Sequence, residues 1–269
     1  MKSAFAAGLL SIFALTTVGR AAERPVVVVT TTLLATAVNE MAGDSVKVHT
    51  LMPGGTCPGS FDLTPADARL MAQAVLFFRH EFQGALDRPA RAAGLPAEAV
   101  VAPPSGGALT IPSVYAGFCA RLAEPLGAKL DAAARARIEE RLQAIATRAS
   151  EASQAALART TALQGRPVLV AQFQADFVRW LGLATPAIYP PGDDPSARVL
   201  AHATELARRC GVVAIVGNLQ NGRRAPDALG ELLRMPVIML SNFPPDGQAG
   251  AYWRMLDANV QALQEGVKW

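Results

Sequence analysis

The stretch PGGTCPGSFDLTPAD, residues 53–67, is the part of the sequence around which the fold can be worked out. It follows residues 46–52, an apolar run that is typical of a strand. It ends at Thr64-Pro65-Ala66-Asp67, which combines a capping threonine, a proline at the first helical position and an acid in the first turn, and so predicts a helix start. A loop rich in glycine and proline that also carries a thiol, a hydroxyl and carboxylates places chemistry at the edge of a sheet.

Short apolar runs rich in β-branched residues alternate with amphipathic segments on both sides of this loop. In the first part of the chain the runs at 25–30, 46–52, 75–78 and 100–102 predict strands. The pattern resumes later with predicted strands at 167–171, 186–189, 212–216 and 236–240, and a helix capped by Asp194-Pro195 is expected before the third of these. Alternation of this kind predicts two α/β lobes, each with a parallel sheet. Ligands bind such sheets outside the carboxyl ends of the strands, so we expect a ligand cleft between the lobes.

A segment of different amino-acid composition separates the two α/β parts. Residues 131–163 contain no glycine or proline, and Ile138, Leu142, Ile145 and Ala149 follow one another at helical spacing. This predicts one long, rigid helix that joins the lobes. Its stripe of small apolar residues favours packing along the surface of the lobes over a coiled-coil dimer, which would make the chain an interaction protein. The expected organisation is a signal peptide at 1–22, an amino-terminal lobe at 23–125, the connecting helix at 126–165 and a carboxyl-terminal lobe at 166–269.

The amino terminus and the charge indicate the compartment and the class of partner. Met1-Lys2 precedes an apolar stretch too short for a typical membrane span, and small residues follow it around Ala21 and Ala22, as in a cleavable secretory signal. The net charge is +3, and removal of Lys2 and Arg20 leaves +3 − 2 = +1. The basic residues are dispersed, so nucleic acid is not an expected partner. The sequence therefore predicts an exported, periplasmic and monomeric protein.

Taken together in this order, these features resemble the exported substrate-binding proteins of metal ABC transporters, the zinc and manganese receptors with a rigid backbone helix. Residues 53–67 fit that family's loop Pro-x-Gly-x-Asp-Pro-His-Ser-Tyr-Glu-Pro-Thr-Pro-Ser-Asp at Pro58, Phe61, Asp62, Thr64-Pro65 and Asp67. Residues 177–183, FVRWLGL, are similar to its Phe-x-x-x-Tyr-Gly-Leu segment. Tyr252, Met255 and Asn259 match its closing Tyr-x-x-Met-x-x-x-Asn element.

The departures from the family lie at its metal ligands. The resemblance implies three histidines and one carboxylate, or two of each, which suit zinc and manganese. Here the histidine positions fall at Gly59 or Ser60, at Ser113, and near Ala171 or Gln172, and the closing aspartate falls near Ser241 or Asn242. Asn218 stands where many relatives have a glutamate. His49, His80 and His202 do not restore the set, because their positions are typical of surface or core histidines.

The candidate site is therefore a mostly uncharged cleft. The candidate ligand-binding residues are Ser60, Ser113, Gln172, Asn218, Gln220 and Asn242, and the candidate metal ligands are Cys57 and Asp62. One thiolate and one carboxylate are fewer protein ligands than a zinc site usually has. An amide-lined cleft suits a neutral polar ligand or a metal complex better than a bare dication, which is costly to desolvate without anionic partners.

These features predict a receptor that does no chemistry. We expect the periplasmic component of a metal-type ABC importer, which captures zinc or manganese between its lobes as cargo and delivers it to a permease at the inner membrane; no organic cofactor is expected. Alternatives within the fold are a receptor for a chelated metal or small polar ligand, and a degenerate member that binds no metal. A two-lobed α/β enzyme is a remote alternative, because the sequence has no Ser-His-Asp order and no glycine-rich phosphate loop after its first strand.

Overall fold

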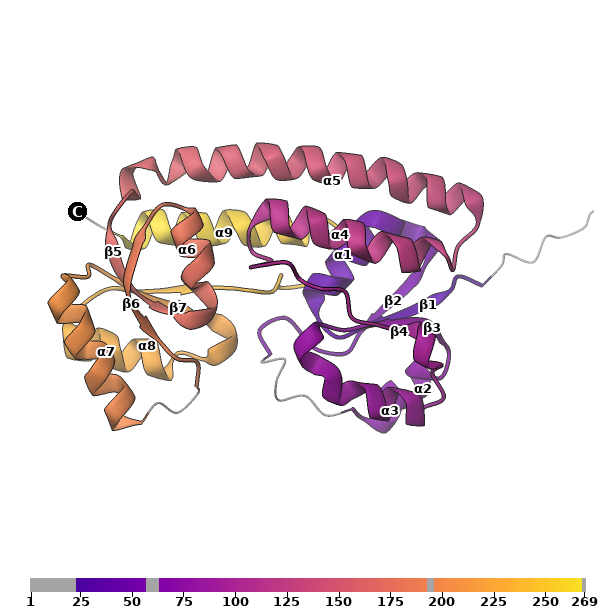
Figure 1. Cartoon of the computed structure of the whole chain (residues 1–269), viewed down its shortest axis with the longest axis horizontal. Coiled ribbons are helices and arrows are strands. Elements are labelled where there is room, and N and C mark those ends of the chain that lie inside the picture. Colours follow the sequence, from indigo (N-terminus) through magenta and orange to yellow (C-terminus); the bar gives the residue numbers. More distant parts are fainter. Residues whose placement is uncertain (1–22, 57–62, 193–195, 268–269) are drawn as a thin grey trace, which may run out of the picture.

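The computed structural model describes residues 23–56, 63–192 and 196–267, and it has two α/β lobes bridged by a long helix (Figure 1). The two-lobed parallel fold predicted from the sequence is confirmed. Within the described ranges, no helix combines the length and the apolar character needed to cross a membrane. The proposed signal peptide at 1–22 lies outside these ranges.

The amino-terminal lobe is built on a parallel sheet in the order β2-β1-β3-β4. The strands are β1 (Val26–Val29), β2 (Lys47–Thr50), β3 (Ala74–Phe78) and β4 (Val100–Val101). The helices are α1 (Thr32–Ala42), α2 (Pro65–Met71), α3 (Asp87–Ala92) and α4 (Pro112–Gly127), with shorter 3₁₀ turns η1 (Gly43–Ser45), η2 (Glu81–Leu86) and η3 (Ala97–Ala99). At the start of α2, Thr64 is the cap that the sequence predicts, with Pro65 in the first turn, and Asp67 completes a capping box with it.

The carboxyl-terminal lobe repeats the same parallel topology in the order β6-β5-β7-β8. The strands are β5 (Pro167–Ala171), β6 (Ala184–Tyr189), β7 (Ile215–Asn218) and β8 (Val237–Leu240). The helices are α6 (Ala175–Trp180), α7 (Ala197–Cys210), α8 (Arg224–Leu233) and α9 (Ala251–Gly266), with 3₁₀ turns η5 (Gln172–Gln174) and η6 (Leu219–Asn221).

Several element boundaries in this lobe differ from the sequence-based expectation. Helix α7 is capped by Ser196, whose hydroxyl accepts from the Val199 N–H, whereas Asp194-Pro195, where the sequence predicts the cap, lie outside the described residues. Strand β7 begins at Ile215 rather than at residue 212. Gly211 adopts a left-handed conformation, and the Val212 N–H donates to the Ala207 carbonyl. Because Gly211 and Val212 form the carboxyl-terminal cap of α7, the strand begins only after them.

Helix α5 (Ala132–Arg159) runs along both lobes and ends in the 3₁₀ turn η4 (Thr161–Leu163) (Figure 1). The predicted stripe is buried at Ile138, Ile145 and Ala149. It packs on helices of the same chain, mainly α4, α1 and α9. A coiled-coil partner is therefore not needed to cover it, and one continuous hydrophobic cluster extends from the first lobe into the second.

The lobes are also joined by residues 241–250, which we call the crossing segment. It leaves β8, reaches the amino-terminal lobe and returns into α9 (Figure 1). Along α1, Thr32 Oγ1 donates to the Pro244 carbonyl at 2.7 Å and Asn39 Nδ2 donates to the Gly247 carbonyl at 2.8 Å. A Cβ at Gly247 would lie 2.6 Å from Cβ of Ala35, so only glycine permits this approach.

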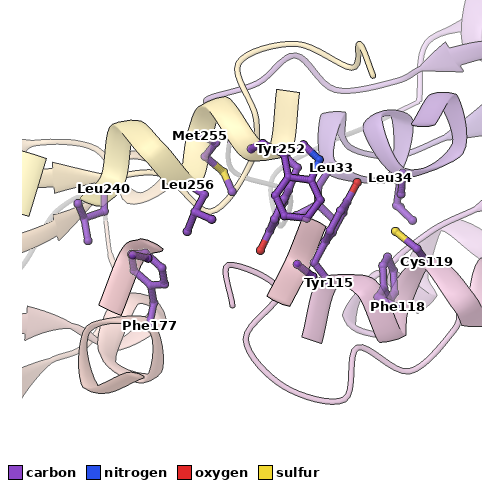
Figure 2. Packing of buried hydrophobic residues seen from close by; sticks show 14 of the residues in the cluster. Leu33, Leu34, Tyr115, Phe118, Cys119, Phe177, Leu240, Tyr252, Met255 and Leu256 are labelled. Atoms are coloured by element: carbon purple, nitrogen blue, oxygen red, sulfur yellow. The ribbon is translucent and has the colours of Figure 1, made fainter. Parts of the chain in front are cut away.

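A cluster of polar and aromatic side chains lies at the junction of the lobes. Glu40 on α1 accepts hydrogen bonds from Tyr115 Oη at 3.1 Å and from Trp253 Nε1 at 2.6 Å. Arg148 Nη1 on α5 lies 3.9 Å from Glu40, and its guanidinium lies over the Trp253 ring. The Tyr115 and Tyr252 rings stack with centroids 3.7 Å apart, between core residues of the two lobes (Figure 2). The junction is thus held by four helices at once, and we call these five side chains the Glu40 cluster.

Candidate functional site

The carboxyl ends of strands from both lobes surround one pocket of about 430 Å³. The amino-terminal lobe contributes His80 and Phe82, which follow β3, and Pro103, which follows β4. Phe173 follows β5, and Asn242 and Phe243 follow β8. The position agrees with the expected cleft between lobes, since side chains at the ends of parallel strands converge there.

The amide residues predicted after β7 and β8 are brought together. Asn242 Oδ1 accepts from Gln174 Nε2 at 2.9 Å, and Asn218 Oδ1 lies 3.3 Å from the same nitrogen. Gln220 Oε1 accepts from the Asn242 backbone N–H, and its Nε2 donates to Ser241 Oγ. Most amide groups are therefore committed to one another, and among the predicted residues that the structure describes Asn242 alone lines the pocket.

Gln174 is the member of this network that sequence reasoning missed. Its side chain is fully buried and links Asn218 to Asn242, whereas Gln172, two residues earlier, is exposed. The 3₁₀ turn η5 sets this difference, because it rotates the chain directly after β5. Gln174 Oε1 is buried without a hydrogen-bond partner. The Gln-Phe-Gln sequence after β5 offers two candidate glutamines, and the conformation of the turn decides which of them is buried.

Other predicted residues lie away from the pocket or outside the described ranges. Ser113 is exposed in the first turn of α4, and neither Ser113 nor Gln172 lines the pocket. Cys57, Ser60 and Asp62 lie outside the described ranges. Among the described residues, no group of three or more histidine, cysteine, aspartate or glutamate side chains could hold a metal ion.

His80 is a buried part of the pocket wall. Its Nε2 lies 2.9 Å from Thr31 Oγ1, and its backbone N–H donates to Gln83 Oε1. The ring stacks on Phe82 and Phe118, with centroids 5.4 and 6.1 Å away, and is tilted against Phe243. Burial lowers the pKa of His80 from 6.5 to about 4, so the ring stays neutral at ordinary pH.

This burial predicts a pH dependence of stability. The folded protein resists protonation of His80 between pH 6.5 and about 4, whereas the unfolded chain accepts the proton, so unfolding is favoured as the pH falls through this window. The free energy of unfolding should drop by about 3 kcal/mol across it from this group alone. Urea unfolding of the wild type and His80→Gln between pH 4 and 7 measures the difference. His202→Gln, on the exposed face of α7, is the control and should follow the wild type. Parallel curves for wild type and His80→Gln would contradict the assignment.

Known proteins resemble this chain in two ways: solved structures share its overall fold, and a family model matches the sequence of its amino-terminal lobe. The family model described as "Zinc-uptake complex component A periplasmic" matches residues 27–109. The structure of ZnuA is similar at a TM-score of 0.75 and 18% identity, covering 91% of this chain and 100% of that chain. The periplasmic zinc-binding protein TroA from Treponema pallidum is similar at 0.76 and 16%, covering 91% and 100%. The substrate-binding protein FpvC from P. aeruginosa, solved in complex with Ni²⁺, is similar at 0.76 and 17%, covering 91% and 97%. No curated protein matches the sequence.

These likenesses extend over nearly the whole described chain and include both lobes and the long helix. The predicted resemblance is thus confirmed: this chain has the two-lobed fold of the periplasmic metal-binding proteins of ABC transporters, and its amino-terminal lobe carries the sequence pattern of the zinc-uptake component A family.

Proposed function

We propose that this protein is the periplasmic cargo receptor of a metal-type ABC importer. It captures a cargo that contains a metal of the zinc or manganese class between its lobes and presents it to a permease at the inner membrane. The observation that carries the proposal is the likeness to metal-binding receptors across both lobes, joined to the family match at residues 27–109. The chain acts as a monomer and catalyses no reaction.

The arrangement of the lobes supports reversible capture rather than catalysis. The pocket opens between the two sheets, while the crossing segment and α5 hold the lobes on either side of it. The amides at the carboxyl ends of β5, β7 and β8 bond mainly to one another, so they stiffen one wall of the cleft. We propose Asn242 as a contact of the cargo, and Asn218 and Gln220 as residues that position it. Cys57, Ser60, Asp62, Ser113 and Gln172 stay candidates from the sequence.

Metal accumulation in cells tests this function. A strain that lacks the gene, grown with limiting metal, should accumulate less zinc or manganese than the wild type by elemental mass spectrometry. The plasmid-borne gene should restore accumulation, and a copy that lacks residues 1–22 should not. Unchanged contents of both metals in the deletion strain would refute the proposed function.

A further inference from the structure

The pocket is much larger than a metal ion requires. Its volume of about 430 Å³ lies in the range of sites for small organic ligands, which is roughly 300–1,000 Å³. A protein site for zinc closes around the ion with ligands at about 2 Å. The size of the cleft therefore indicates an occupant that contains an organic part.

Two exposed phenylalanines determine which kind of organic part fits. Phe82 in η2 is 66% exposed and Phe173 in η5 is 52% exposed, although both line the pocket. They come from opposite lobes, each in the 3₁₀ turn that follows a strand. Phe82 is already stacked on His80 with an interplanar angle of 6°, so its ring is held in a fixed orientation. Aromatic rings that present an exposed face to a cleft bind flat, unsaturated groups by stacking.

The polar groups of the pocket favour a cargo that brings its own metal ligands. Among the described residues that line it, Glu81 is the one carboxylate, and its Oε2 accepts from the Ser105 backbone N–H at 3.0 Å. Asn242 Oδ1 already accepts from Gln174, and the His80 ring is held by Thr31. Within the described part of the pocket, a bare dication would have this single carboxylate to offset the loss of its water shell. One carboxylate is sufficient to balance part of the charge of a metal that stays coordinated by a chelator.

We propose that the cargo is a metal ion held in a small planar aromatic chelator, and that Phe82 and Phe173 grip the chelator between the lobes. This inference rests on the proposed function and names the form in which the metal is carried. The lobes supply two stacking faces, Glu81 supplies negative charge, and the chelator completes the coordination of the metal.

Isothermal titration of the mature full-length protein tests the inference. The probes are zinc chloride, phenanthroline or bipyridyl alone, and the equimolar complex of zinc with each chelator. We expect at least one complex to bind at least about tenfold more tightly than zinc chloride or its free chelator. Phe82→Ala and Phe173→Ala should each weaken that binding by about tenfold, the loss expected for one good aromatic contact. Phe82→Leu, which keeps apolar volume but not a flat face, should be weakened to nearly the same extent.

Leu232→Ala is the matched control, because Leu232 is 53% exposed on α8 and does not line the pocket. Binding by this variant should equal that of the wild type. Tight binding of zinc chloride that is insensitive to the phenylalanine substitutions would overturn the inference and leave the proposed function standing. Tighter binding of a chelator without zinc, or no binding of either complex, would also overturn it. The proposed function is tested separately, by the metal content of the deletion strain.

Discussion

Glu40→Ala should lower the free energy of unfolding by about 3 kcal/mol, because it leaves two donors of the Glu40 cluster without an acceptor. Tyr115 is fully buried and Trp253 is 6% exposed, and both donate to this one carboxylate. The Glu40 side chain is only 12% exposed, so water has limited access to replace the carboxylate. The same change removes the partner of Arg148 on α5. Urea unfolding followed by circular dichroism gives the free energy directly.

Two further variants separate the hydrogen bonds from the charge. Glu40→Gln keeps one acceptor oxygen but turns an amide N–H₂ toward the second donor, so it should fall between the wild type and Glu40→Ala. Glu140→Ala removes a carboxylate from the exposed face of α5 and should change the free energy of unfolding by less than about 0.5 kcal/mol. A loss for Glu40→Ala as small as that of Glu140→Ala would show that the lobes are not joined through this carboxylate.

Tyr252→Ala should lower the free energy of unfolding by about 3–5 kcal/mol, the range found for loss of a buried aromatic ring. Tyr252 is fully buried, stacks on Tyr115 and meets Trp253 edge-on, so its removal opens a cavity between core residues of both lobes (Figure 2). Because Tyr252 Oη is buried without a hydrogen-bond partner, Tyr252→Phe should be neutral or slightly stabilising.

The same ring pair offers its own control. Tyr115 Oη donates to Glu40, so Tyr115→Phe should cost about 1–2 kcal/mol although it removes the same atom as Tyr252→Phe. Burial raises the pKa of both tyrosines well above the usual range, so each hydroxyl stays protonated under all of these conditions. Equal effects of the two phenylalanine substitutions in thermal unfolding would be inconsistent with this assignment of hydrogen bonds.

The fold could be predicted because local patterns determine it. Runs such as 25–30 have few alternatives to a buried strand, and the lack of glycine and proline over 131–163 leaves a helix as the simplest outcome. The crossing segment could not be predicted, because Thr32 and Asn39 bond to carbonyls more than 200 residues away. Such contacts depend on the packing of two finished lobes. Nothing in the sequence around either partner indicates them.

The candidate site was predicted less completely than the fold. The sequence indicates an uncharged cleft, and Asn218, Gln220 and Asn242 do lie near one another. It does not show that these amides are occupied with each other, nor that Gln174 rather than Gln172 joins them. The sequence does not single out Phe82 and Phe173, because an isolated phenylalanine after a strand is usually a core residue. Their exposure is visible only once both lobes are in place.

Native mass spectrometry of the protein released from the periplasm by osmotic shock tests the central claim most directly. We predict a bound species that contains one metal ion by elemental analysis and whose excess mass is greater than that of the ion, with this excess lost in the double variant Phe82→Ala/Phe173→Ala. A protein that emerges at the mass of the polypeptide alone, without metal, or one that carries only a bare ion, would contradict the account.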